Sequence, residues 1–210
     1  MKRQLGLTLV ELLVVISVLG IAGVLILNIF TSTLKGSNKT QVIGAIKQNG
    51  QAVLETMDKT IRNADQVVCV SGDGKKGKSL VVVEKGVYTR YKFIDPLPVL
   101  NPANNGLLQQ DSPNKSTAGV DPGTDKEYTD PAFVNKVCAD ADLLIQPVVL
   151  TDNNTQKGIS LVNGWFTRAK VAGFKDQIKI EFEVKPGILA SQAVAGQIDP
   201  VRFETTITLR

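Results

Sequence analysis

Residues 7–30 read LTLVELLVVISVLGIAGVLILNIF and decide the fold. From residue 12 to residue 27 the run carries no charge, and Ser17 is its only polar side chain. The nineteen residues from 12 to 30 would rise about 28 Å as a helix, close to the roughly 30 Å of a bilayer core. The lipid interior forces the backbone to satisfy its own hydrogen bonds, so a membrane-spanning helix is predicted despite many β-branched residues.

The residues flanking this run predict its orientation. Lys2 and Arg3 precede it, and positive charges favour the cytoplasmic side, so the rest of the chain is expected outside the cytoplasm. A cleaved secretory signal would end in a small-residue cleavage site, but residues 31–34 read TSTL. A plain signal anchor fits, yet it gives no reason for Glu11. A carboxylate there costs a few kcal/mol unless it snorkels to the interface or finds a partner.

Composition excludes several kinds of site. The 210 residues carry a net charge of +4, and Lys75, Lys76 and Lys78 alternate with glycines as in a solvated turn. No specific nucleic-acid partner is therefore predicted. The absence of histidine excludes a His-containing triad and a His-bearing zinc site. No nucleophile is paired with a base at a recognisable spacing, so neither an enzyme nor a cofactor is predicted.

The chain has two cysteines, Cys69 and Cys138, too few for a structural zinc site. They lie in the part expected outside the cytoplasm, where a disulfide is the predicted state and two free thiols are the alternative. Closing a loop of about 70 residues would contribute about 4 kcal/mol in the chain-entropy model.

A helical period resumes directly after Phe30. Apolar residues recur at three- and four-residue steps, namely Val42, Ile46, Val53, Met57, Ile61 and Ala64. We expect one helix from about Leu7 to Asn63, whose soluble half lays this stripe against a sheet. Gly36, Gly44 and Gly50 would each weaken the helix by up to about 1 kcal/mol.

From residue 66 onward the pattern changes to period two. Seven segments read as strands: QVVCVS, SLVVVE, VYTRYKFI, LLIQPVVL, ISLVNGWFTRA, QIKIEFEVK and RFETTITL. Residues 84–86 predict a hairpin turn between the second and third segments. The expected fold is α+β, a long N-terminal helix packed on an antiparallel β-sheet whose other face meets water. Trp165 is expected in the core or at a sheet edge, with contact to a partner as the alternative.

Residues 95–131 interrupt this pattern with six prolines and many small polar residues, which predicts a long surface excursion bracketed by the two cysteines. Its acidic residues are calcium candidates: Asp111, Asp121, Asp125, Glu127 and Asp130. Because EF-hand spacing is absent, ordinary turn chemistry is preferred and no metal site is predicted.

The N-terminus resembles that of type IV pilin precursors. MKRQLG is a short basic leader ending in Gly6, with Thr8 two residues and Glu11 five residues beyond it. LTLVELLVVISVLGIAG is similar to the family's helix almost residue by residue. It departs from the family in Leu7, where Phe is usual, and in lacking the mid-helix proline of many major pilins. The resemblance implies that a prepilin peptidase cuts between Gly6 and Leu7 and methylates the new amine of Leu7.

The resemblance also implies a role for Glu11. In a pilin-like filament its carboxylate would face the α-amino group of Leu7 on a neighbouring subunit, since opposite charges in a low-dielectric bundle satisfy one another. The chain is then expected to divide into a leader (residues 1–6), a transmembrane and filament-core helix (7–30), an amphipathic helical half (31–65) and an extracytoplasmic β-rich domain (66–210).

Two further stretches, QNGQAVLETMDKTIRNADQV and FETTITLR, are similar to larger minor pilins and J-type pseudopilins of type II secretion. The predicted function is a structural minor subunit of a type IV pilus, type II secretion or competence-type filament. Its partners would be prepilin peptidase, the inner-membrane assembly platform and other pilin-like subunits. The chain would cross the cytoplasmic membrane once and then join a periplasmic or surface filament. The alternative is a membrane- or filament-tethered adhesin or uptake receptor that binds through residues 95–131.

Overall fold

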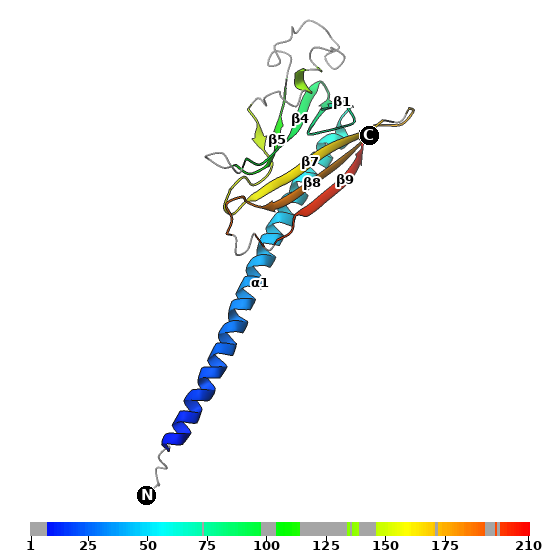
Figure 1. Cartoon of the computed structure of the whole chain (residues 1–210). Coiled ribbons are helices and arrows are strands. Elements are labelled where there is room, and N and C mark those ends of the chain that lie inside the picture. Colours follow the sequence, from blue (N-terminus) through cyan, green and yellow to red (C-terminus); the bar gives the residue numbers. More distant parts are fainter. Residues whose placement is uncertain are drawn as a thin grey trace. The chain divides into compact units, whose positions relative to one another are not determined.

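The computed structural model describes residues 8–72, 74–97, 104–113, 134, 136–138, 146–170, 172–191, 196 and 198–210. The chain forms two compact units, Met1–Gln41 and Val42–Arg210. The helix α1 (Leu9–Asn63, 55 residues) begins in the first unit and ends in the second (Figure 1). It ends where the change of sequence period predicted, and β1 follows after two residues.

The second unit contains two antiparallel sheets where the sequence predicted one. The strands are β1 (Gln66–Val70), β2 (Lys76–Gly77), β3 (Ser79–Glu84), β4 (Val87–Ile94), β5 (Leu107–Asp111), β6 (Val148–Val149), β7 (Ile159–Ala169), β8 (Gln177–Pro186) and β9 (Val201–Thr208). One sheet has the order β1-β3-β4-β5-β6 and the other β2-β7-β8-β9. Period-two alternation identifies strands, but it does not say which strands pair.

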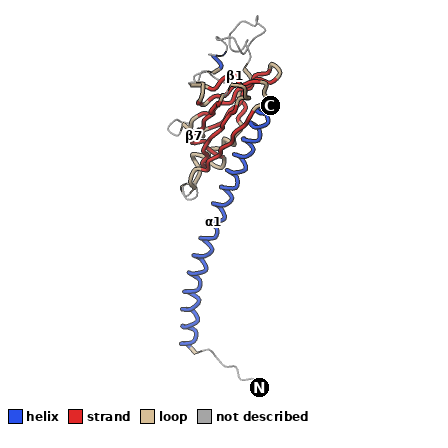
Figure 2. The backbone as a smooth tube through the Cα atoms, turned by 90° about the vertical axis from the view of Figure 1, so that its right-hand side faces the viewer, coloured by secondary structure: helices blue, strands red, loops and turns tan. Residues whose placement is uncertain are grey.

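The C-terminal part of α1 packs on the sheets through the predicted apolar stripe (Figure 2). Ile46, Val53, Met57 and Ile61 are buried in one core with side chains from both sheets. Two stacked aromatic pairs extend this core, with ring centroids 4.7 Å apart for Phe93 and Phe166 and 5.1 Å apart for Phe182 and Phe203. The C-terminal part of α1 therefore belongs to the main core of the second unit.

The turn between β3 and β4 is the predicted two-residue hairpin. Glu84 pairs with Val87, and both Lys85 (φ 48°) and Gly86 (φ 80°) have positive φ. Positive φ at both central residues gives the turn the twist that antiparallel strands need. The Lys85 amide also donates to the Asp65 carboxylate at 2.6 Å, which ties the turn to the segment after α1.

The expectation of one water-facing sheet face holds for β8 but is wrong for β3. Residues of β8 alternate between buried and partly exposed, as predicted. By contrast, β3 reads SLVVVE and its first five residues are all buried. Leu80 and Val82 face the main core, whereas Val81 and Val83 join a second cluster with Cys69, Tyr88 and Val137. A strand covered on both faces needs apolar residues on both, which explains the run without alternation.

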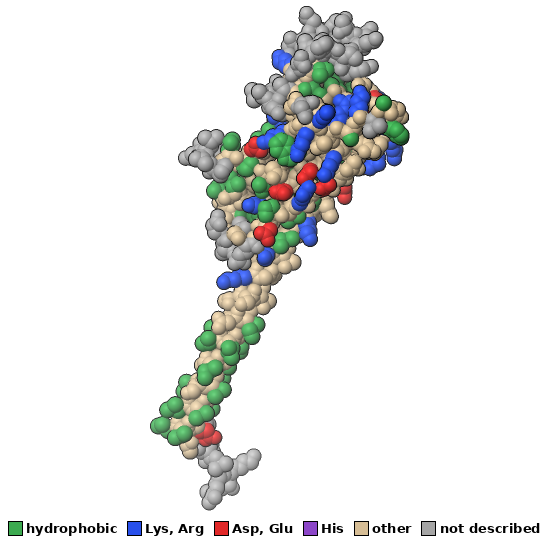
Figure 3. Space-filling view, turned by 45° about the vertical axis from the view of Figure 1, so that its right-hand side comes forward, with side chains coloured by type: hydrophobic (Ala, Val, Ile, Leu, Met, Phe, Trp, Pro, Cys, Tyr) green, Lys and Arg blue, Asp and Glu red, His purple; other side chains and the backbone are tan. Residues whose placement is uncertain are grey.

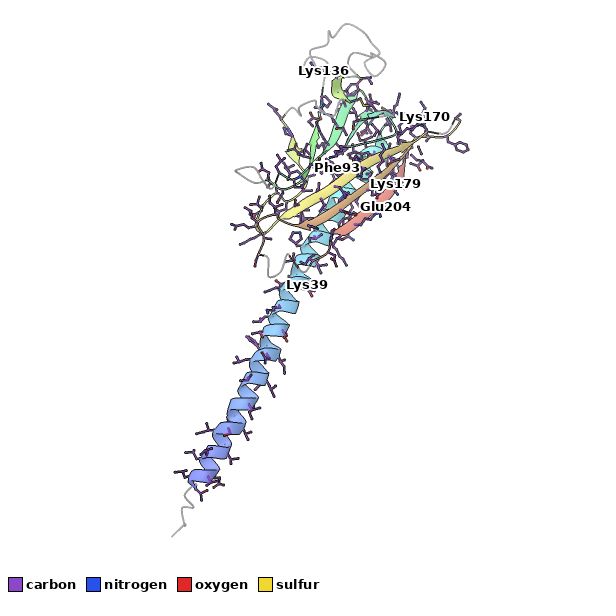
Figure 4. All side chains as sticks on the ribbon, in the orientation of Figure 1. Lys39, Phe93, Lys136, Lys170, Lys179 and Glu204 are labelled. Atoms are coloured by element: carbon purple, nitrogen blue, oxygen red, sulfur yellow. A yellow bond between two sulfur atoms is a disulfide. The ribbon has the colours of Figure 1, made fainter. Side chains whose placement is uncertain are left out.

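The outer face of β8 and β9 carries a network of opposite charges. The Lys179 ammonium lies 2.8 Å from Glu204 and 3.3 Å from Glu181 (Figure 4). The hydrogen bond from Lys179 lowers the pKa of Glu204, because it favours the charged carboxylate. These side chains are partly exposed to solvent, so the network is expected to contribute little to stability.

Two segments differ from their predicted structure. β5 lies inside the excursion predicted for residues 95–131; its LLQQD sequence was assigned to a loop because polar residues and prolines surround it. In the predicted strand LLIQPVVL, only Val148 and Val149 form a strand, after Pro147, which lacks an amide donor. The first three residues of that segment lie outside the described residues.

Gly50 allows close packing against Phe203, which its low helix propensity alone does not indicate. A Cβ built there would lie 2.2 Å from the ring of Phe203, whereas one at Gly44 meets nothing within 4 Å. We expect Gly50→Ala to lower the free energy of unfolding by about 1–3 kcal/mol through overpacking, although alanine favours the helix. The matched change Gly44→Ala should raise it by up to about 1 kcal/mol. Denaturant unfolding of both full-length variants measures the direction of each change in the free energy of unfolding. Equal stabilisation by the two substitutions would contradict the close contact between Gly50 and Phe203.

Candidate assembly site

The first unit presents an apolar helix whose side chains are largely exposed among the described residues. Between residues 9 and 30 nearly every side chain is exposed, for example Leu9 at 79% and Ile29 at 68%. An 18-residue window within α1 has a mean hydropathy of 2.8, and none of it is buried. Figure 3 shows hydrophobic side chains along this part of the helix. By length and composition the helix is able to cross a membrane, which supports membrane anchoring.

Hydroxyl side chains of this helix donate hydrogen bonds to backbone carbonyls of the preceding turn. The Ser17 hydroxyl donates to the carbonyl of Leu13 at 2.8 Å, and the Thr33 hydroxyl donates to Ile29 at 2.9 Å. A hydroxyl satisfied in this way carries little cost in an apolar environment. Ser17 is therefore compatible with either lipid or a bundle of helices around it.

Thr8 caps the start of α1, and this feature was missed in the sequence. Its hydroxyl accepts a hydrogen bond from the Glu11 amide at 3.3 Å, while its carbonyl accepts one from Leu12 at 3.1 Å. The spacing Thr-x-x-Glu is the signature of a capping box and was available in the sequence. The cap fixes Glu11 in the first helical turn, where a negative charge is favoured by the helix dipole.

The Glu11 side chain is exposed, and among the residues that the structure describes it has no ion-pair partner. Gly6 and Leu7, the residues of the predicted cleavage site, lie outside the described residues. The structure places the Glu11 carboxylate in the first turn of an apolar helix whose side chains are exposed. A charge in that setting is stable in water, but in lipid or a helix bundle it requires a counter-charge.

The fold and this helix together define a class: a long N-terminal helix on antiparallel β-sheets, an α+β arrangement like that of pilins. Residues 1–27 match the family model described as the prokaryotic N-terminal methylation motif. This match supports a type IV pilin-like family and indicates a substrate of prepilin peptidase that assembles with other pilin subunits. Neither a curated protein nor a solved structure matches the chain.

The two predicted disulfide partners meet in the second unit. Cys69 of β1 and Cys138 form a disulfide with their Cα atoms 6.1 Å apart and a sequence separation of 69. Cys69 packs in the second apolar cluster, and Val137 covers the same sheet face. The disulfide therefore links residues 136–138 to the five-stranded sheet.

A buried ion pair beside the disulfide was not predicted. Arg90 of β4 donates to both carboxylate oxygens of Asp111 on β5, at 2.9 and 2.6 Å, and a third nitrogen donates to the carbonyl of Val137 at 3.2 Å. The two side chains are 1% and 0% exposed. Asp111 is thus a partner of Arg90, not the calcium candidate considered from sequence.

The remaining calcium candidates, Asp121, Asp125, Glu127 and Asp130, lie outside the described residues. Across the described part of the chain, no group of three or more acidic or cysteine side chains is arranged to hold a metal ion.

Trp165 is partly exposed on β7, with the ammonium groups of Lys76 and Lys78 at 5.2 and 5.4 Å from its ring centroid. Trp165 is therefore a surface aromatic covered by cations rather than a core residue.

Proposed function

We propose that this chain is a structural minor pilin or pseudopilin, cleaved between Gly6 and Leu7 and assembled into a filament through α1. The observation that carries the proposal is the carboxylate of Glu11 in the first turn of an apolar helix whose described side chains are exposed. The methylation motif at residues 1–27 supports the same role.

The chemistry of cleavage explains why the acid belongs in that turn. Removing residues 1–6 would create a positive α-amino group at Leu7, next to the positive end of the helix dipole, where a cation is unfavourable. Within an apolar bundle that amine and the Glu11 carboxylate would each be costly alone and compatible together. When the two groups belong to neighbouring subunits, the pair sets the axial register of the helices.

The finer assignment to a minor, J-type subunit rests on the two stretches named above. These stretches pack together in the second unit, because Phe203 lies against Gly50 and the Arg210 amide donates to the Arg62 carbonyl at 3.2 Å. The two stretches that carry the resemblance are therefore neighbours in the fold. A minor subunit should be scarce relative to the main subunit of its filament.

Processing is tested with a bulky residue at the cleavage site. In cells that contain a prepilin peptidase, we expect the native chain to lose residues 1–6 and gain a methyl group on Leu7. Gly6→Leu should leave the chain uncut, because a large side chain replaces the glycine at the scissile bond. Gly20→Leu is the control, since a Cβ there meets nothing within 4 Å. Intact-protein mass spectrometry reads all three, and an uncut native chain would contradict the proposal.

A further inference from the structure

The turn that joins β7 to β8 carries the most exposed aromatic ring among the described residues. Phe174 is 78% exposed, and its neighbours Lys170, Ala172, Gly173 and Lys175 are exposed as well. Gly173 has φ +82°, a conformation that favours glycine and turns the chain just before the ring. The turn lies beside the C-terminus of the chain (Figure 1).

The base of this turn is held rigidly on several sides. Arg168 donates two hydrogen bonds to the Asp176 carboxylate, at 2.5 and 3.1 Å, and both side chains are largely buried. The Arg168 amide donates to the Lys75 carbonyl at 2.7 Å, and the Leu209 amide donates to the Asp176 carbonyl at 3.2 Å. Phe174 is thus presented from a fixed base, so burying it in a partner would cost little extra ordering.

The charge around Phe174 is positive. Within the described part of the chain neither Lys170 nor Lys175 forms an ion pair, and the adjacent carboxylate of Asp176 is engaged by Arg168. Lys76 pairs across from Thr167 at the end of β7, which adds a further lysine on the neighbouring strand. Figure 4 labels Lys170 at the turn end of the hairpin.

We propose that the hairpin tip, defined by the described residues 170 and 172–175, docks onto an acidic surface of another protein subunit. Phe174 enters an apolar recess there, and Lys170 and Lys175 pair with carboxylates around the recess. A single rigid aromatic anchor with a charged rim is the usual anatomy of a protein–protein hot spot. The partner is a neighbouring subunit of the same filament, so this inference rests on the proposed function.

Other anionic partners fit the tip less well. Single-stranded nucleic acid is held by successive bases stacked on several open rings, but the partly exposed aromatic of β7, Trp165, already has two ammonium groups over its ring. A lipid surface is bound by a broad apolar face, and the described residues of the tip offer one large apolar side chain.

The test places a photo-crosslinking amino acid at position 174 of the full-length chain in its native cells. The same amino acid at Val148, which is 61% exposed on β6, provides the control for general exposure. We expect position 174 to yield an adduct with one protein, at a site rich in Asp and Glu, and position 148 to yield none. The charge reversals Lys170→Glu and Lys175→Glu together should reduce the adduct about tenfold.

A matched pair of exposed lysines elsewhere, Lys157→Glu and Lys185→Glu, should leave the adduct unchanged. The docking proposal is overturned if position 174 gives no more adduct than position 148, if the adduct survives the tip reversals, or if it is with lipid or nucleic acid. The mature N-terminus is measured on the same samples. A processed chain without the adduct overturns only the docking, whereas an unprocessed chain overturns the proposed function.

Discussion

Replacing Glu11 by alanine is expected to leave the chain cleaved and methylated but to remove it from the filament. Under the proposed function, cleavage would depend on the leader and Gly6, whereas assembly would depend on a counter-charge for the amine of Leu7. An amine left unpaired in a helix bundle is expected to cost about 3–5 kcal/mol, enough to reduce incorporation by about a hundredfold or more. Sheared filaments and membranes are compared by immunoblotting, with the N-terminal mass of each pool measured in parallel.

Two control variants separate the intersubunit pair from local capping. Thr8→Ala removes the hydroxyl that caps the Glu11 amide and should cost only about 1 kcal/mol of helix stability, with incorporation retained. Glu11→Gln keeps the size of the side chain without its charge and should behave like Glu11→Ala. If Glu11→Gln assembles normally, or if Thr8→Ala fails as completely as Glu11→Ala, the charge pair is not what recruits the subunit.

Removing the carboxylate of Asp111 is expected to destabilise the second unit strongly. The Arg90 guanidinium would keep its charge at 1% exposure while losing both of its hydrogen bonds to Asp111. Stranding one partner of a buried ion pair costs about 3–5 kcal/mol. Asp111→Ala should therefore lower the free energy of unfolding by that amount, measured by denaturant unfolding of the full chain in detergent.

The control for this change is an exposed ion pair in the same unit. Asp95 pairs with Lys78 but is 56% exposed, so Asp95→Ala should cost less than about 1 kcal/mol. The double change Arg90→Met with Asp111→Leu should recover most of the lost stability, because apolar residues of similar volume replace a buried pair without a stranded charge. Equal effects of Asp111→Ala and Asp95→Ala would contradict the burial of the Arg90–Asp111 pair.

The sequence predicted those features of the fold that depend on residues close together in the chain. The apolar stripe of α1, its end at Asn63 and the hairpin at Lys85 and Gly86 all follow from residue spacing and turn chemistry. What the patterns did not predict was contact across the sequence. The Arg90–Asp111 pair joins residues 21 positions apart, and the ring that requires Gly50 comes from Phe203. A glycine that weakens a helix in isolation becomes necessary only when a distant aromatic packs against it.

The candidate site shows the same division. Glu11 is identifiable from sequence because a charge interrupts an apolar run, and its role in assembly stays a prediction. The cap by Thr8 follows from the local spacing Thr-x-x-Glu, whereas the sequence analysis considered only the charge of Glu11. The exposed ring of Phe174 could not be predicted, since a phenylalanine near two strands is ordinarily expected in the core. Its 78% exposure and the pairing of Arg168 with Asp176 below it depend on how the strands pair.

The most direct measurement of the central claim is peptide mass spectrometry after zero-length carbodiimide coupling of the native assembly. Such coupling joins a carboxylate to an amine only when the two groups touch. The expected product is a cross-linked peptide that joins two different subunits, either through the Glu11 carboxylate of this chain and the N-terminal amine of its neighbour, or through the methylated Leu7 amine of this chain and a carboxylate of its neighbour. A loop that joins Leu7 to Glu11 of the same chain, or a working chain that still begins at Met1 and is recovered uncoupled, would contradict the claim.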